Sequence, residues 1–198
     1  LKLISRIDIC LDFATFDNSM SPEFFVSEYM RGEFLKLHQS RLHSYGTDYE
    51  VSLAAHGRDA IKTKIWNSLS WGSKKSSITT KMYNKSLEMR QTKKKHYIIN
   101  RWEKAGLCPD VNDIWRIEFS LSSAIKGYVR IDDGELIPSS LSLYDNEDKL
   151  LRAWNTCASR LFVFVDGSTA TRKSRMKKLD LFAMNDEACK PVELSTEE

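Results

Sequence analysis

The sequence predicts an α+β domain whose largely antiparallel β-sheet carries helices packed on one face. Several segments alternate apolar and polar residues, as half-buried strands do, and three others repeat apolar residues at helical spacing. Along the chain the order is strand, helix, several strands, helix, strand, helix. Strands grouped in this way favour an α+β fold over a regular alternation of strand and helix.

Three strands are predicted with one apolar and one polar face. They span residues 3–13, 77–83 and 114–121, and the apolar faces are expected to form the core. The polar faces carry, in chain order, Arg6, Asp8, Cys10 and Asp12; Ser77, Thr79, Lys81 and Tyr83; and Arg116, Glu118 and Ser120.

Further elements follow from turn and cap residues. Turns around Gly46 and Gly57 are expected to bracket a strand at 49–54, and a strand at 63–71 ends at a hairpin that begins with Gly72. The three helices are predicted from an N-cap at Ser21 toward residue 42, over 86–106 and over 150–161. A turn is expected at 132–134.

The composition fits one globular domain. The 198 residues are 41% hydrophobic and 29% charged, and no apolar run is long enough to span a bilayer. We expect residues 1–183 to form a catalytic domain, as a fragment of a longer protein, and residues 184–198 to be a disordered acidic tail. The four cysteines are far apart, which favours reduced thiols and a cytoplasmic location over a disulfide framework or a zinc site.

The net charge of +3 conceals a basic segment at residues 58–104. It holds thirteen lysines and arginines against three acidic residues, so its net charge is +10. Such a segment is a candidate for binding the phosphate backbone of DNA, and a solvated helix face would have the same composition.

The three polar strand faces contain the residue types needed for phosphoryl transfer. If the strands are neighbours, their carboxylates can hold a divalent cation, and oxygen ligands suit Mg²⁺ or Mn²⁺. A tyrosine hydroxyl is a poor nucleophile at neutral pH, so nearby cations would help Tyr83 to react. The alternative is a water-facing sheet surface on which Asp8 pairs with Arg116 or Lys81.

Three segments together resemble the replication initiation factor family, which comprises rolling-circle plasmid replication initiators and relaxases of integrative conjugative elements. They are R-I-D-I-C-L-D-F at 6–13, S-L-S-W-G-S-K-K-S-S-I-T-T-K-M-Y-N-K-S-L-E-M at 68–89, and W-R-I-E-F-S-L at 115–121. The family similarly carries an R-x-D strand followed by an acid, a G-S-x-x-S segment leading to Y-[DNE]-K, and an R-x-E strand, in this order.

The resemblance implies a metal-dependent nick in one DNA strand that leaves a 5′-phosphotyrosyl link. It implies that Tyr83 is the nucleophile and that Lys85 contacts the phosphate or the phenolate. Asp8 and Glu118, with Asp12 as a third, match the acids that would hold Mg²⁺ or Mn²⁺. The partners implied are single-stranded or locally melted DNA and a second copy of the chain in a homodimer. The candidate DNA-binding residues are Lys74, Lys75, Lys81, Arg116, Lys93, Lys94 and Lys95.

Several other residues compete for these roles. Tyr97 is an alternative nucleophile on a helix, and His56 could approach the metal or be structural. Ser73 and Ser76 could contact DNA or shape the hairpin. Trp66, Trp71 and Trp102 could stack on bases, although Trp102 and one of the two strand tryptophans are expected in the core. A DNA-binding module that does not cut is the principal alternative function, and a protein-interaction domain is a third.

Overall fold

The computed structural model describes residues 6–38, 41–51, 61–73, 76, 78–92, 95–122 and 147–182. Its helices and strands are, in chain order, β1 (Arg6–Phe13), α1 (Pro22–Arg31), β2 (Phe34–Lys36), β3 (Leu42–Val51), β4 (Ile61–Trp71), β5 (Ile78–Asn84), α2 (Lys85–Gln91), α3 (His96–Lys104), β6 (Trp115–Ser122), α4 (Glu147–Leu161), β7 (Phe164–Asp166) and the short 3₁₀ helix η2 (Lys173–Arg175).

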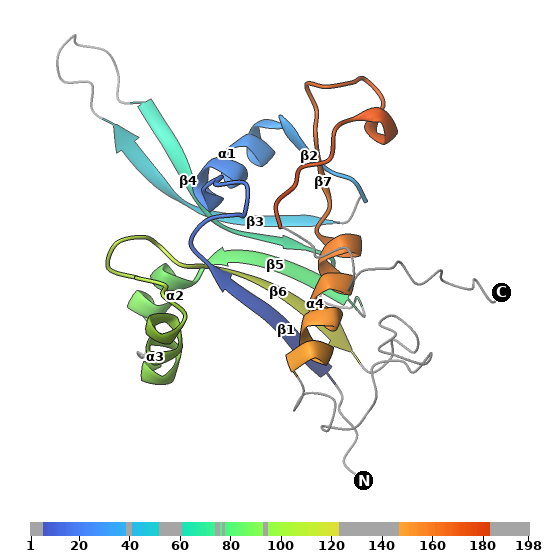
Figure 1. Ribbon diagram of the computed structural model, residues 1–198. Helices are drawn as coiled ribbons and strands as arrows, with labels where there is room; N and C mark the ends of the chain where they lie inside the picture. The colour runs from blue at the N-terminus through green and yellow to red at the C-terminus, as the bar shows by residue number, and fades with distance from the viewer. Residues whose placement is uncertain are drawn as a thin grey trace.

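Five strands form one antiparallel sheet in the order β1-β6-β5-β4-β3, and β2 pairs with β7 in a separate two-stranded sheet. The predicted α+β class is therefore confirmed. Figure 1 shows α4 lying across β1 and β6, α1 beside β3 and β4, and the pair α2 and α3 near the opposite end of the sheet.

The main core lies between one face of the five-stranded sheet and the helices α1 and α4. Strand residues predicted to be apolar alternate into it, and Met82, Ile117 and Phe119 have no exposed surface. Their polar neighbours Lys81, Arg116 and Glu118 retain solvent contact on the other face. The predicted alternation of β1, β5 and β6 is thus confirmed, and it separates an apolar from a polar sheet face.

The first helix is shorter than its apolar spacing predicts. Ser21 caps α1 by accepting a hydrogen bond from the amide of Phe24 at 3.2 Å, and Pro22 is the first helical residue, as expected. The helix ends at Gly32, whose φ of +87° is left-handed. The predicted continuation toward residue 42 is wrong, because Phe34 starts β2, which pairs with the distant β7.

The strand predicted at 49–54 begins earlier than expected, while residues 52–54 and the turn predicted around Gly57 lie outside the described residues. β3 begins at Leu42 and runs through Gly46, where the register with β4 shifts at a bulge. A Cβ atom at Gly46 would lie 2.6 Å from the carbonyl oxygen of Ile65. Gly46 therefore allows β3 and β4 to approach closely at the bulge, and it does not form the predicted turn.

The helix predicted at 86–106 is two helices. α2 ends at Thr92, which is extended, and α3 ends before Gly106, which has the left-handed φ expected of a C-terminal cap residue. Together they enclose a second, smaller core with Met89, Ile98, Trp102 and Ile114. One long helix could not fold back to bury both sets of apolar residues.

The predicted helix at 150–161 is confirmed as α4, which starts at Glu147. The turn predicted at 132–134 and the tail predicted at 184–198 lie outside the described residues. None of the described helices is both long and apolar enough to span a membrane.

We expect Gly72→Ala to destabilise the protein more than Gly106→Ala. Both glycines have positive φ, but a Cβ at Gly72 would lie 2.9 Å from the carbonyl oxygen of Ile78, whereas a Cβ at Gly106 would meet nothing within 4 Å. The expected losses are about 3 and about 1 kcal/mol, measured by urea unfolding. Equal losses would show that the β4–β5 connection relaxes around the methyl group.

Candidate active site

The three strands that carry the sequence motifs lie side by side, with β6 between β1 and β5. Their antiparallel register aligns the polar residues in rows across the sheet. We call this surface the polar face. Its three rows are Asp8, Ser120 and Thr79; Cys10, Glu118 and Lys81; and Asp12, Arg116 and Tyr83.

Two acids, Asp8 on β1 and Glu118 on β6, lie in adjacent rows at the more open end of the polar face. The Ser120 hydroxyl lies 3.4 Å from Glu118 Oε1 and also hydrogen-bonds Asp8. Burial would raise the pKa of Asp8, but Ser120 and the guanidinium of Arg6, 2.8 Å away, outweigh it and lower that pKa. Lys81 Nζ lies 3.3 Å from Glu118 Oε1. Because one hydroxyl proton can serve only one carboxylate at a time, this pair of acids has acceptor capacity to spare.

The other end of the polar face is closed by an ion pair. Arg116 donates to both oxygens of Asp12, at 2.5 and 2.7 Å, and the indole nitrogen of Trp102 donates to Asp12 Oδ2 at 2.8 Å. The side chains of Arg116 and Asp12 are only 15% and 17% exposed. Burial opposes the charge of Arg116, yet the hydrogen bond and charge of Asp12 raise its pKa. Asp12 therefore holds Arg116 in place.

Tyr83 lies beside this pair and is partly buried. Burial raises the pKa of its phenol well above the usual value, while the charge of Arg116 and a hydrogen bond from it act in the opposite direction. The neutral phenol is thus the resting form, and Arg116 is the group placed to stabilise a phenolate.

A strand-to-helix junction places Lys85 against Tyr83. Asn84 ends β5 and caps α2 by accepting a hydrogen bond from the Leu87 amide at 2.7 Å. Lys85 is therefore the first helical residue, and its ammonium lies 5.6 Å from the centroid of the Tyr83 ring. Lys85 also forms an ion pair with Glu88, and its side chain is 3% exposed. The Y-N-K motif is thus a cap that fixes a buried cation over the tyrosine.

A cavity of about 680 Å³ opens at the Asp8 end of the polar face. Its lining is rich in hydroxyl groups and includes the cations Arg6 and Lys81. Ser73 and Ser76 line the cavity and also bond one another, with their hydroxyl oxygens 3.2 Å apart and the Ser73 amide donating to Ser76 Oγ. The two roles considered for these serines are therefore compatible.

Sequence reasoning missed the contribution of β3. His43 pairs with Ser70 and lines the cavity, and Tyr45 pairs with Ser68, which itself pairs with Tyr83. Tyr45 is 68% exposed, so the polar face continues to the sheet edge with an accessible aromatic ring. Residues 42–45 are Leu-His-Ser-Tyr and do not alternate apolar and polar residues, so the sequence offers no periodic signal for this part of β3.

The remaining candidates lie apart from the three rows. Lys95 is exposed immediately before α3, and Tyr97 on that helix is 64% exposed. Trp71 and Trp102 are buried, as expected for one strand tryptophan and the helix tryptophan, while Trp66 is partly buried beneath Lys64. The candidates that fall outside the described residues are Lys74, Lys75, Lys93, Lys94 and His56.

Within the described ranges, no three histidine, cysteine, aspartate or glutamate side chains cluster closely enough to hold a metal ion. Both oxygens of Asp12, the expected third ligand, accept hydrogen bonds from Arg116. Asp8 and Glu118 are two carboxylates in adjacent rows of the polar face, with acceptor capacity to spare. Two carboxylates fit Mg²⁺ when substrate phosphate and water supply the other ligands.

No protein-family model and no curated protein sequence matches this chain. Among solved structures, it is similar to the rolling circle replication initiator protein from Geobacillus stearothermophilus, with a TM-score of 0.47 and 17% sequence identity. The match covers 89% of this chain and 52% of that one, so this chain spans about half the length of that protein.

We expect Arg116→Ala to cost about 2–4 kcal/mol of unfolding free energy, because it leaves the largely buried carboxylate of Asp12 without its cation. Arg90→Ala removes a more exposed pair, since Arg90 is 56% exposed beside Asp113, and should cost less than about 1 kcal/mol. Urea unfolding measures both. Similar small losses would mean that water replaces the guanidinium at Asp12.

Because the pKa of Tyr83 is raised, we expect the free energy of unfolding to fall at alkaline pH. The unfolded chain releases the phenol proton near pH 10 while the folded chain retains it, so stability is fully present below pH 10 and falls above it. In Tyr83→Phe this fall should be shallower by up to about 1 kcal/mol per pH unit. Urea unfolding from pH 8 to 11 measures it, and Tyr97→Phe, which keeps Tyr83, should retain the steeper fall.

Proposed function

We propose that this domain is a DNA strand-nicking and strand-transfer endonuclease that acts through Tyr83 in rolling-circle replication or transfer of a mobile element. The observation that carries the proposal is the register of β1, β6 and β5. It brings the three sequence motifs, far apart along the chain, onto one sheet face with Tyr83, Asp8 and Glu118.

In the proposed reaction the Tyr83 phenol releases its proton to solvent, and its oxygen forms a bond to the phosphorus of a DNA phosphodiester as the bond from phosphorus to O3′ breaks. The products are a 5′-phosphotyrosyl link and a 3′-hydroxyl, which takes up a proton. Attack by a 3′-hydroxyl on the phosphotyrosyl link reverses the step and joins the strands. A covalent intermediate of this kind conserves the energy of the broken bond.

The neighbouring cations prepare Tyr83 for attack. Arg116 is held by Asp12 and would stabilise the phenolate through its charge and a hydrogen bond. Lys85 adds positive charge at the ring. Lys81 is 42% exposed and can exchange Glu118 for a DNA phosphate. The chain thus supplies both a stabilised nucleophile and a contact to the scissile strand.

Asp8 and Glu118 would hold the Mg²⁺ or Mn²⁺ ion. A bound divalent ion would neutralise charge on the phosphate as the leaving oxygen develops its own. Asp12 is assigned to positioning Arg116. The hydroxyl-lined cavity beside Asp8 and the exposed Tyr45 ring extend the face along which single-stranded or locally melted DNA would lie.

The second candidate function is a DNA-binding module that does not cut. It is favoured by two observations, namely the burial that raises the pKa of Tyr83 and the engagement of Asp12 by Arg116. Such a module would use the same cations and hydroxyl groups to contact phosphates without forming a covalent bond.

Incubation with single-stranded DNA and Mn²⁺ should give a covalent protein–DNA adduct that survives denaturing electrophoresis. Tyr83→Phe should abolish the adduct because no phenol oxygen remains, and Asp8→Asn and Glu118→Gln should each reduce it by at least about tenfold. The adduct should form faster as pH rises from 7 to 9, since a larger fraction of Tyr83 is ionised.

Tyr97→Phe is the matched control and should leave adduct formation unchanged. An adduct retained in Tyr83→Phe contradicts the assignment of the nucleophile. DNA binding that weakens steeply with salt but never yields an adduct in any of several origin-like sequences supports the non-cutting module instead.

A further inference from the structure

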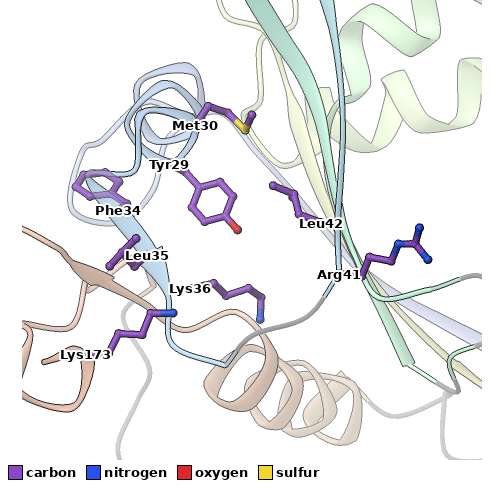
Figure 2. Close-up of a pocket in the computed structure, with 8 residues that line it drawn as sticks. All are labelled: Tyr29, Met30, Phe34, Leu35, Lys36, Arg41, Leu42 and Lys173. Carbon is purple, nitrogen blue, oxygen red and sulfur yellow. The ribbon is translucent and has the colours of Figure 1, made fainter.

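A second pocket, of about 580 Å³, lies outside the polar face. Figure 2 shows it between the end of α1, β2, the start of β3 and the segment that contains η2. Lys36 projects into it from β2 with its side chain toward the end of α4, and Tyr29 points its hydroxyl into the same space. The site proposed for strand nicking uses none of these residues.

Lys36 is a buried cation that lacks a carboxylate partner among the described residues. It is 7% exposed, its ammonium donates to the carbonyl oxygen of Leu161, and it lies 5.9 Å from the ring centroids of Trp71 and Phe164. Burial, together with the charge of Lys173, lowers its pKa to about 8. The Leu161 bond caps the C-terminal end of α4 and uses one of three N–H donors.

Tyr29 adds a second donor to the pocket. Its oxygen accepts a hydrogen bond from the indole nitrogen of Trp71 at 2.9 Å, which leaves the hydroxyl proton free to donate elsewhere. Burial raises the pKa of Tyr29, so the hydroxyl keeps this proton at neutral pH. The pocket therefore offers hydrogen-bond donors at its centre.

The other polar side chains of the lining are cations. Lys173 contributes from η2, near enough to affect Lys36, and Arg41 stands at the rim with its guanidinium turned outward in Figure 2. No described acidic side chain lines the pocket. Lys36 and Lys173 thus share the pocket with a phenol proton and no described carboxylate. An anion would complete this site, because a buried cation is costly until it is paired.

The remaining walls are apolar and include Met30, Phe34 and Leu42. The volume exceeds what a bare inorganic anion would fill and lies within the range of small-molecule sites. The rings of Tyr29 and Phe34 offer flat surfaces for a planar group, and Met30 adapts its shape to a ligand.

We propose that this pocket binds a nucleoside monophosphate unit, with its phosphate at Lys36, Tyr29 and Lys173 and its base against the apolar wall. The unit could be a free nucleotide or the 5′-phosphorylated end of a DNA strand, which present the same chemistry. This proposal does not depend on the nicking activity.

The test is a calorimetric titration of the full chain with 2′-deoxyadenosine 5′-monophosphate, 2′-deoxyadenosine and inorganic phosphate. We expect saturable binding of the monophosphate at millimolar concentration, at least about tenfold weaker binding of the nucleoside, and weaker binding of phosphate alone. Lys173→Ala should weaken binding of the monophosphate about tenfold. Arg175→Ala is the control, because Arg175 lies exposed in the same 3₁₀ helix without lining the pocket.

Lys36→Met tests the buried cation directly and should abolish binding. If this variant unfolds, Lys173→Ala still decides the question, since Lys173 is partly exposed. Absence of binding, or binding equally weakened by Arg175→Ala, overturns the proposal, and phosphate binding as tightly as the nucleotide overturns its nucleotide part.

Oligonucleotides with and without a 5′-phosphate separate the two sources of the ligand. A preference for the phosphorylated end that Lys173→Ala removes and Arg175→Ala preserves assigns the pocket to DNA ends. Equal binding of both oligonucleotides, with the mononucleotide still bound, assigns it to free nucleotide.

Discussion

The structure depends on the register of β1, β6 and β5, which the burial of one sheet face sets. Ile117 and Phe119 are fully buried in the main core, where Phe119 packs against Trp154 of α4. A slip of one residue would move these side chains into solvent and bring Arg116 and Glu118 into the core, at a cost of several kcal/mol. The positions of the polar groups on the other face are therefore set by apolar packing.

The second core extends this constraint to the end of the polar face. Trp102 is buried among the residues of α2 and α3, yet its indole nitrogen bonds Asp12 on β1. Asp12 in turn orients Arg116 toward Tyr83. Burial here raises the strength of each ionic contact and lowers the acidity of the phenol at the same time. The fixed ionic contacts and the weakly acidic phenol thus have one physical origin.

Strand alternation predicts the sheet face on which each candidate residue lies, but it does not predict which side chains pair with one another. Alternation placed Tyr83, Asp8 and Glu118 on polar faces, and the structure makes those faces neighbours. Asp12 has the same pattern in sequence but is engaged by Arg116. His43 and Tyr45 were missed because Gly46, interpreted as a turn, lies inside a strand.

The sequence by itself determined the α+β class, the two faces of each motif strand and the cap residues Ser21 and Gly106, because periodicity and capping act between residues close in the chain. Tertiary structure decided the strand order, the pairing of β2 with β7, the division of the 86–106 segment and the burial of Lys36. Each of these results from contacts between distant segments, whose free energy outweighs local preference and leaves no periodic trace along the chain.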